Sequence, residues 1–531
     1  MSTRHLLHSL YTRSNFGGAA GRLAIVSLAL LGISPSNSEA VIWSVGSVAE
    51  TSPLAFPDDT CIWIHPNDRE KSVVLGTNKN TSPGGIYAWS LSGGASIWDN
   101  SSAENGLTNN VDLRYGFPAG PESWDIVCSS NRSSRTLDVY RIETDENEDF
   151  LGLVKEGAIP IGDGWASGTD APYGCAMFQT PTQYSCLLSD KVGNVGQFHL
   201  QFDAAANPGQ RIIATRVAFW DVTKNNSEVE GIVADDPAEV IYIAAEDLAI
   251  YRFETANNLV LPATSTTVAV PNAVTGPFVP DVEGLTIWYS SEDGEGYLIA
   301  SSQGHGSESS DYYSTFAVFE RSFTPGEPNA HIFNYELSAG PGSIDEVTET
   351  DGIDVANLSL GATYASGIMV AHDEPNDSDA ENFKFASWKD IATAPDSSSD
   401  YLRFIGDGSE AGWDPRTREG DVSSTLGPWP IDPSESALQG QLRIVPQPFS
   451  KHTTVHFAVG RERGPQRVRV SVFNIAGREV SLLAEGVLAP GDHSTRWDGT
   501  DGAGQEVPAG AYWIRVAAGG EAWFIQSVLI R

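Results

Sequence analysis

Short runs of Val, Ile, Tyr and Trp recur along the chain, often with polar residues at alternate positions, and Gly- and Pro-rich turns separate them. Alternation with a period of two predicts β-strands. Outside residues 1–40, no long stretch carries apolar residues at helical spacing. The pattern therefore predicts an all-β protein, and a chain of 531 residues predicts more than one domain.

Six strand-like segments share a beginning, in which an acid or Tyr precedes apolar residues. Successive segments lie 53 to 68 residues apart and start at Asp59, Asp112, Tyr173, Glu230, Glu283 and Asp351. Further short strands follow in several repeats, for example at 73–77, 184–188, 240–244 and 297–301. A period of this length with about four strands is typical of a β-propeller blade. Six repeats predict a six-bladed β-propeller with acids around its channel, whereas two stacked sandwiches, the alternative, predict no fixed period.

The best-marked repeat contains Asp281-Val282-Glu283-Gly284, and a near copy, Glu228-Val229-Glu230-Gly231, lies upstream. Residues two apart on a strand leave from the same face, so Asp281 and Glu283 lie side by side. Two carboxylates on a half-buried face repel each other, and each raises the pKa of the other unless a cation lies between them. We expect these strands to present acids to a shared site.

Composition changes mark further segments. Arg4, Arg13 and Arg22 precede an apolar run at 23–33 that is too short to span a bilayer, which predicts a signal peptide at 1–40 and a secreted protein, periplasmic or surface-attached forms included. The propeller follows at 41–419, and a Gly-, Ser- and Pro-rich linker at 420–441. Alternating strands at 442–531 predict a small Ig-like β-sandwich.

The formal charge of −37 argues against nucleic-acid binding and against docking on anionic lipid. Solvated surface acids and metal binding both account for such a charge. The four cysteines fit an oxidising compartment. A hairpin turn centred in 179–182 places Cys175 opposite Cys186 within reach of a disulfide, and Cys61 and Cys128 form the second pair by elimination; four buried thiols are the alternative.

The candidate metal ligands are all oxygen donors from separate repeats: Asp58, Asp59, Glu230, Glu246, Asp281, Glu283, Gln303, Asp345 and Asp351. The propeller region contains no His-x-x-x-His pair, which disfavours zinc and favours calcium, an ion that accepts six to eight oxygens. Lys79, Arg132, Tyr173 and Lys191 stand in the same repeats. Basic groups here either neutralise neighbouring acids or, beside a metal cluster, bind a substrate rich in phosphate.

These stretches resemble the β-propeller phytases, also called alkaline or calcium-dependent 3-phytases. The matching motifs occur in family order over roughly 45–395 and include Asp58-Asp59, Thr77-Asn78-Lys79, Asn109-Asn110-Val111-Asp112, Ser130-Asn131-Arg132-Ser133, Glu230-Gly231, Asp281 to Tyr289, Gln303-Gly304, Asp351-Gly352 and Asn382-Phe383-Lys384. The resemblance implies a six-bladed propeller that binds several calcium ions and hydrolyses phytate, myo-inositol hexakisphosphate, by in-line attack of a calcium-bound water.

The resemblance also implies roles for single residues. Glu230, Asp281, Glu283 and Gln303 resemble ligands of the catalytic calcium ions, with Glu246 beside them. Glu50, Asp59, Asp345 and Asp351 resemble ligands of other calcium ions, and Asp58 adjoins them. Four further residues resemble the family's phosphate-contacting groups: Lys79, Arg132, Tyr173 and Lys191. Asn382 is a further substrate-binding residue. Catalysis is thereby assigned to Glu230, Asp281 and Glu283 with Lys79, Arg132 and Tyr173.

The second domain resembles the FlgD-like immunoglobulin modules of exported bacterial proteins through Pro446-Gln447-Pro448-Phe449, Trp497-Asp498-Gly499 and Pro508-Ala509-Gly510. Such a module serves in sorting or surface attachment, or as a spacer. The sequence thus predicts a secreted, calcium-dependent phosphomonoesterase. The alternative is a non-catalytic calcium-binding propeller displayed at the cell surface.

Overall fold

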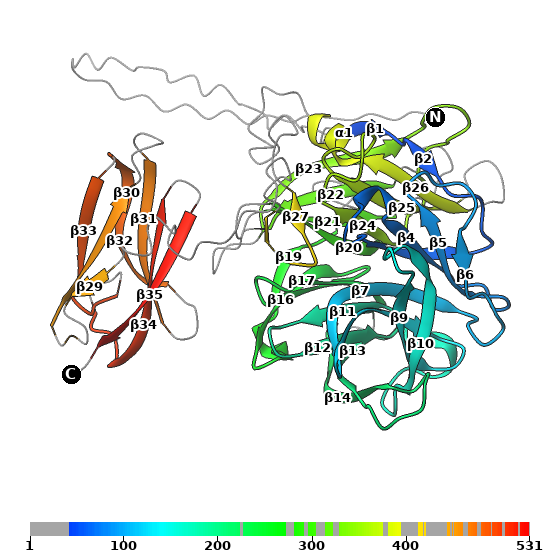
Figure 1. Ribbon diagram of the computed structural model, residues 1–531, viewed down its shortest axis with the longest axis horizontal. Coiled ribbons are helices and arrows are strands. Elements are labelled where there is room, and N and C mark those ends of the chain that lie inside the picture. Colours follow the sequence, from blue (N-terminus) through cyan, green and yellow to red (C-terminus); the bar gives the residue numbers. More distant parts are fainter. Residues whose placement is uncertain are drawn as a thin grey trace, which may run out of the picture. The chain divides into compact units, whose positions relative to one another are not determined.

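The computed structural model describes residues 42–223, 227–271, 281–290, 296–303, 314–321, 329–374, 381–394, 412–417, 419–420, 443–445, 449, 451–459, 466–474, 479–489, 491–501, 505–518 and 521–529. Strands dominate these residues (Figure 1). The predicted signal peptide and nearly all of the predicted linker lie outside the described residues, as does Pro446-Gln447-Pro448.

Six sheets form the first part of the chain, antiparallel except where β1 joins the fifth, and apart from β1 and β2 each sheet follows the previous one in sequence. The first sheet is β3 (Pro57–Trp63), β4 (Val73–Asn78), β5 (Gly85–Ser90) and β6 (Trp98–Asp99), and the second is β7 (Thr108–Ala119), β8 (Glu122–Asn131), β9 (Thr136–Thr144) and β10 (Phe150–Pro160). The third sheet is β11 (Cys175–Gln179), β12 (Tyr184–Ser189), β13 (Asn194–Phe202) and β14 (Ile212–Asp221). The fourth is β15 (Val229–Asp235), β16 (Val240–Ala245), β17 (Ala249–Ala256), β18 (Leu259–Val260) and β19 (Thr266–Ala269).

The last two sheets also take in the first strands of the chain. The fifth sheet is β20 (Val282–Tyr289), β21 (Gly296–Ser302), β22 (Thr315–Glu320) and β23 (His331–Ser338), with β1 (Ile42–Gly46) parallel to β23. The sixth is β24 (Ile353–Ala356), β25 (Ile368–Asp373) and β26 (Asn382–Ser387), with β2 (Ala49–Glu50) antiparallel to β26. In Figure 1 the blue N-terminal strands accordingly lie beside green and yellow ones.

The first strands of the six sheets, β3, β7, β11, β15, β20 and β24, contact one another in a closed ring, and β24 returns to β3. This closure is a six-bladed β-propeller, so the sequence prediction is confirmed. The core lies between blades and is built mainly from buried Val, Ile, Leu and aromatic residues. Short helices connect or follow strands: α1 (Trp388–Thr393) and the 3-10 turns Arg69–Lys71, Gly168–Asp170 and Pro262–Thr264.

Four of the six innermost strands have two residues near their start that interrupt the pairing, and in the other two the equivalent residues precede the strand. The interrupted pairs are Asp58-Asp59, Asn109-Asn110, Glu230-Gly231 and Glu283-Gly284, and Tyr173-Gly174 and Asp351-Gly352 stand just before β11 and β24. The sequence had placed the start of the second repeat at Asp112. The shared interruption shows that Asn109 holds the equivalent position. The sequence pattern missed it because an amide stands there in place of an acid.

The Gly of these pairs allows adjacent blades to approach. A Cβ on Gly231 would lie 2.0 Å from the carbonyl oxygen of Glu283, and one on Gly284 would lie 2.7 Å from that of Asp351. No side chain fits in either place without moving the next blade. The repeated Val-Glu-Gly is therefore a packing requirement that sets one Glu beside the next.

A short β-hairpin of β27 (Trp413–Asp414) and β28 (Glu419–Gly420) follows the sixth blade. The Trp413 ring stacks on Tyr289, with 4.1 Å between ring centroids. Arg416 donates hydrogen bonds to the carbonyl of Ile64 and to Asp125. These contacts lie at the strand ends opposite the acids, so the segment covers the far end of the channel.

Residues 443–529 form a β-sandwich with its own core. One sheet is β29 (Arg443–Val445), β30 (Thr453–Val459) and β33 (Gly491–Trp497), and the other is β32 (Glu479–Leu488), β31 (Gln466–Asn474), β34 (Gly510–Ala518) and β35 (Glu521–Leu529). Trp497 is buried at the centre, with its ring against Phe449 and Tyr512. The predicted Ig-like sandwich is confirmed. No helix among the residues described is long and apolar enough to cross a membrane.

Candidate metal and phosphate site

Three glutamates converge where the innermost strands begin. Glu230 lies on β15, Glu283 on β20, and Glu246 directly follows β16. One carboxylate oxygen of each lies within 4.8 Å of the others, and all three side chains are buried. We refer to Glu230, Glu246 and Glu283 as the glutamate triad. The structure thus brings three of the predicted metal ligands together, and their binding of a metal stays a prediction.

Electrostatics of the glutamate triad are unfavourable without a cation. Burial, followed by the carboxylates of Glu230 and Glu228, raises the pKa of Glu246 to about 9. Burial and then Glu246 likewise hold the pKa of Glu283 well above its usual value. Oε1 of Glu246 and Oε2 of Glu283 are buried without a hydrogen-bond donor. Unpartnered hard oxygens at this spacing fit a calcium ion, which takes oxygen ligands in loose geometry.

Asp281 and Asn109 border the triad. Asp281 is near enough for its charge to raise the pKa of Glu246 further. Asn109 Nδ2 donates to Glu230 Oε1 at 2.6 Å, and Arg132 Nη1 donates to Asn109 Oδ1 at 2.8 Å. Sequence reasoning missed Asn109 as a site residue. Its place at the interrupted start of the second blade was the available signal.

A second group combines acids with an ammonium. Lys79 Nζ lies 2.5 Å from Asp58 Oδ1 and 2.9 Å from Asp351 Oδ2. Gln303 Nε2 donates to Asp351 Oδ1 at 2.6 Å. Burial raises the pKa of Asp58, whereas Lys79 opposes that rise; for Asp351 the opposing charges of Lys79 and His372 outweigh burial and lower the pKa. The charge of Glu230 also raises the pKa of Asp58, so this group and the glutamate triad lie at the same end of the central channel. We call this end the mouth.

Three cationic or phenolic groups stand together at the same mouth. The Tyr173 ring lies close to two cations, with Lys191 Nζ 4.0 Å and Arg132 Cζ 5.2 Å from its centroid. Arg132 Nε also donates to the carbonyl of Thr169 at 2.6 Å, and Lys191 pairs with Glu228. Burial, then Glu230, Glu283 and Glu246, raise the pKa of Tyr173, which places its hydroxyl in the field of the triad. We call Arg132, Tyr173 and Lys191 the cationic arc.

Three other predicted site residues gather elsewhere, around an ammonium that the sequence did not single out. Lys384 Nζ lies 3.1 Å from Glu50, 2.6 Å from Asp345 and 2.7 Å from Asp373. It also donates to Asn382 Oδ1 at 2.8 Å, and its side chain is fully buried. Glu50, Asp345 and Asn382 therefore surround a lysine in this structure, and their binding of calcium or substrate stays a prediction.

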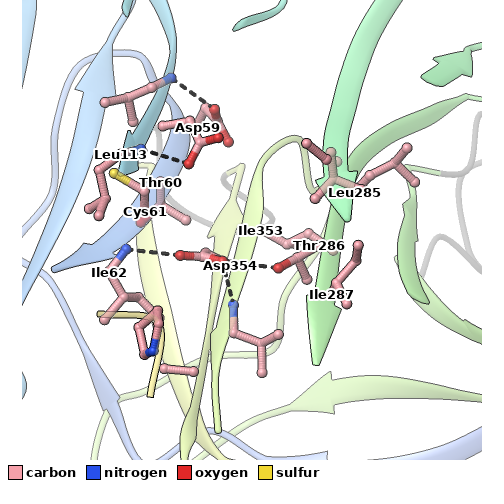
Figure 2. A pocket seen from close by; sticks show the side chains of 18 of the residues that line it. Asp59, Thr60, Cys61, Ile62, Leu113, Leu285, Thr286, Ile287, Ile353 and Asp354 are labelled. Carbon is pink, nitrogen blue, oxygen red and sulfur yellow. Dashed lines mark hydrogen bonds between the residues drawn. The ribbon is translucent and has the colours of Figure 1, made fainter. Parts of the chain in front are cut away.

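Carboxylates deeper in the channel satisfy backbone amides of neighbouring blades. Asp354 accepts from Ile62 N at 2.9 Å and from Thr286 Oγ1 at 2.9 Å, which Figure 2 shows across a cavity of about 150 Å³. Asp59 accepts from Val111 N, and Asp112 from Met177 N. The channel-side edge of an innermost strand has no strand partner, so these acids supply acceptors for its N–H groups. Asp59 and Asp112 thus link blades in the channel wall, and metal binding by Asp59 stays a prediction.

All four cysteines are buried thiols in this structure. Cys175 pairs in register with Leu188, and Cys186 with Met177, so the two cysteines are diagonal rather than opposite as the expected turn implied. The hairpin turn lies later in the chain, since Gln179 pairs with Tyr184. Their Sγ atoms are 3.5 Å apart, and a disulfide between them stays a prediction.

Residues 15–406 match the phytase family, and residues 447–521 match the FlgD Ig-like domain. A 3-phytase of Bacillus subtilis (strain 168) is 34% identical over 361 residues, which cover 66% of this chain and 85% of that protein. The C-terminal match agrees with the sandwich, and the N-terminal match includes the whole mouth.

Similar solved structures include Sqt1 of Chaetomium thermophilum, at 13% identity and a TM-score of 0.32 over 92% of this chain and 99% of that one. PorZ, a surface component of the type-IX secretion system of Porphyromonas gingivalis, has 10% identity and a TM-score of 0.28 over 89% of this chain and 51% of PorZ. Scores this low support no inference. The family match over most of the chain does: this chain belongs to the phytase family and is a phosphoric monoester hydrolase.

Proposed function

We propose that this protein is a calcium-dependent phosphatase that hydrolyses phytate to lower inositol phosphates. The observation that carries the proposal is the glutamate triad with unpartnered buried oxygens at the mouth that also holds the cationic arc. Acids alone would repel a phosphate ester, and cations alone would bind it without activating water. The two together suit a metal-assisted phosphoryl transfer.

The residues that would hold calcium are the glutamate triad and Asp281, with Asp58, Asp351 and Gln303 on the adjoining blades. They supply carboxylate and amide oxygens, the donors that calcium prefers. When bound, calcium supplies positive charge for the phosphate oxygens and makes a water molecule more acidic. No nucleophilic Ser or Cys is needed for such chemistry.

The cationic arc binds and orients the phosphate. The Arg132 guanidinium is held in place by Thr169 and Asn109, which leaves its remaining N–H groups for a phosphate oxygen. Lys191 and the Tyr173 hydroxyl flank it. These groups stabilise charge on the phosphoryl oxygens as the ester bond breaks. Positive groups spread around the mouth favour a substrate with several phosphates.

Phytate is the substrate that the relative from Bacillus subtilis supports, because its name is 3-phytase. Export through a signal peptide at 1–40 and action outside the cytoplasm complete the proposal, with the propeller at 41–419 and a linker at 420–441. The sandwich at 442–531 serves in sorting or surface attachment. Deletion of 442–531, followed by cell fractionation, tests that role: loss of surface protein with activity retained supports attachment.

The test of the activity is phosphate release from phytate by the purified full chain, with calcium and with a chelator. We expect turnover with calcium, none with the chelator, and none for Glu230→Ala. Glu146→Gln, on an exposed loop, is the matched control. Phosphate release from a simple aryl phosphate but not from phytate would overturn the assignment of phytate as the substrate. Calcium binding without any turnover would instead support the displayed, non-catalytic propeller.

A further inference from the structure

Two lysines hold carboxylates that the sequence assigns to calcium, and their surroundings differ. Lys384 has four oxygen neighbours within 3.1 Å and a side chain with 0% exposure. Lys79 has two carboxylate neighbours, and its side chain is 27% exposed. An ammonium has three N–H groups, so Lys384 is fully satisfied and enclosed, whereas Lys79 has a route to solvent.

Lys79 is what compensates Asp58. The carboxylate of Asp58 is fully buried, and neither oxygen accepts a well-directed hydrogen bond among the residues described. Asp351 differs, because Gln303 also donates to it. A buried carboxylate without a counter-charge is costly, so Asp58 stays ionised after Lys79 leaves only if another cation takes its place.

The same geometry prevents Lys79 from binding a phosphate group of a substrate. Its ammonium lies between two carboxylates at 2.5 and 2.9 Å, and a phosphate approaching it would meet both negative charges. Lys79 follows β4 directly, and its long flexible stem allows the ammonium to turn outward while the strand stays in place.

We propose that Lys79 is an exchangeable placeholder for calcium: its ammonium occupies the Asp58–Asp351 pair in the metal-free protein, and calcium binding releases it to meet a phosphate group. This inference rests on the proposed calcium-dependent function. Lys384 is the contrasting case, a permanent internal cation. Calcium and phosphate binding are then coupled, since the cation that fills the acid pair also frees the group that binds the anion.

Amine acylation read by mass spectrometry tests the exchange without any measurement of activity. The full chain is treated with acetic anhydride in calcium and in a chelator, and the acetylation rate of each lysine is compared. We expect Lys79 to react several-fold faster in calcium. Lys71, exposed and paired with Asp149, is the control that keeps its rate. Lys384 is expected to stay unreactive in both.

Calorimetric titration with calcium on the same samples separates this inference from the proposed function. Calcium binding with an unchanged Lys79 rate would overturn the exchange and leave the function standing. Absence of both calcium binding and phosphate release would overturn both. As a second measure, Lys79→Met lowers the Kd for calcium several-fold in protein whose circular dichroism is unchanged, while Lys71→Met does not. Equal Kd values for Lys79→Met and the unaltered protein would contradict the exchange.

Discussion

Asn109 donates its side-chain amide to Glu230 across the mouth, over 2.6 Å, from the second blade to the fourth. On its other side it accepts from Arg132, so it joins the cationic arc to the glutamate triad. An amide suits this place because it donates to an acid and accepts from a base at once. An ionised carboxylate, which four of the other blades carry at this position, could not donate to Glu230.

Asn109→Ala removes the contact that orients Arg132. A hydrogen bond to a charged group is worth about 1.5–3 kcal/mol, so we expect kcat/KM for phytate to fall by roughly 10- to 100-fold. Steady-state kinetics measure the loss, and Asn67→Ala, on an exposed turn, is the matched control. Kinetics of Asn109→Ala equal to those of the control would show that Asn109 does not position Arg132.

Glu246→Gln removes one charge of the glutamate triad and has opposite effects with and without calcium. In a chelator at neutral pH the variant is more stable, because the buried carboxyl of Glu246, with its pKa raised to about 9, must take up a proton on folding and Gln removes that cost. In calcium it gains less stability, since a ligand is lost; binding at 100 times Kd contributes about 2.7 kcal/mol. Thermal melts of both proteins in both conditions give the comparison. A variant less stable than the unaltered protein in chelator would refute the electrostatic account, and Glu146→Gln should change neither melt.

Lys384→Met leaves Glu50, Asp345 and Asp373 without their shared ammonium. Removal of one partner from a buried ion pair costs about 3–5 kcal/mol, and Glu50 on β2 loses its ion pair with the sixth blade. We expect urea denaturation to show a loss of that size. Lys389→Met, on the exposed side of α1, serves as the control. A loss in the free energy of unfolding below about 1 kcal/mol, within the range of surface ion pairs, would mean that the ion pairs of Lys384 do not stabilise the propeller.

Asp354 makes stability depend on pH. Burial, then Asp112, raises its pKa from 3.8 to about 7. Between these values the folded state holds a proton that the unfolded state has lost, so the contribution to stability is complete below about pH 4 and is lost as pH rises through 7. The slope reaches at most about 1.4 kcal/mol per pH unit. Urea denaturation from pH 4 to 8 should show a flatter slope for Asp354→Asn than for Asp163→Asn, an exposed control. Parallel slopes would contradict the raised pKa.

Much of the fold could be predicted because its signals are local. The period-two pattern, the acid or Tyr at each strand start and the following Gly lie within a few residues of one another, so Glu230-Gly231 and Glu283-Gly284 reveal two blades directly. Where an amide replaced the acid, the spacing selected Asp112, three residues too late. The register of β7 corrected that assignment, because the interruption at Asn109-Asn110 involves pairing with another strand.

The site was predictable as a set of acids but not as a set of partners. The sequence by itself determined that an acid or Tyr recurs at the start of six repeats and that cations follow in three of them, since strand alternation and turn chemistry are properties of neighbouring residues. Only the closed ring decided what each acid faces: Glu246 meets other carboxylates, Asp58 an ammonium, Glu50 a buried lysine and Asp354 a backbone amide. The physical reason is that a carboxylate must be compensated by whatever lies within a few ångströms, and the closed ring brings those groups from other strands and blades, in the case of Asp354 and Ile62 from 292 positions away.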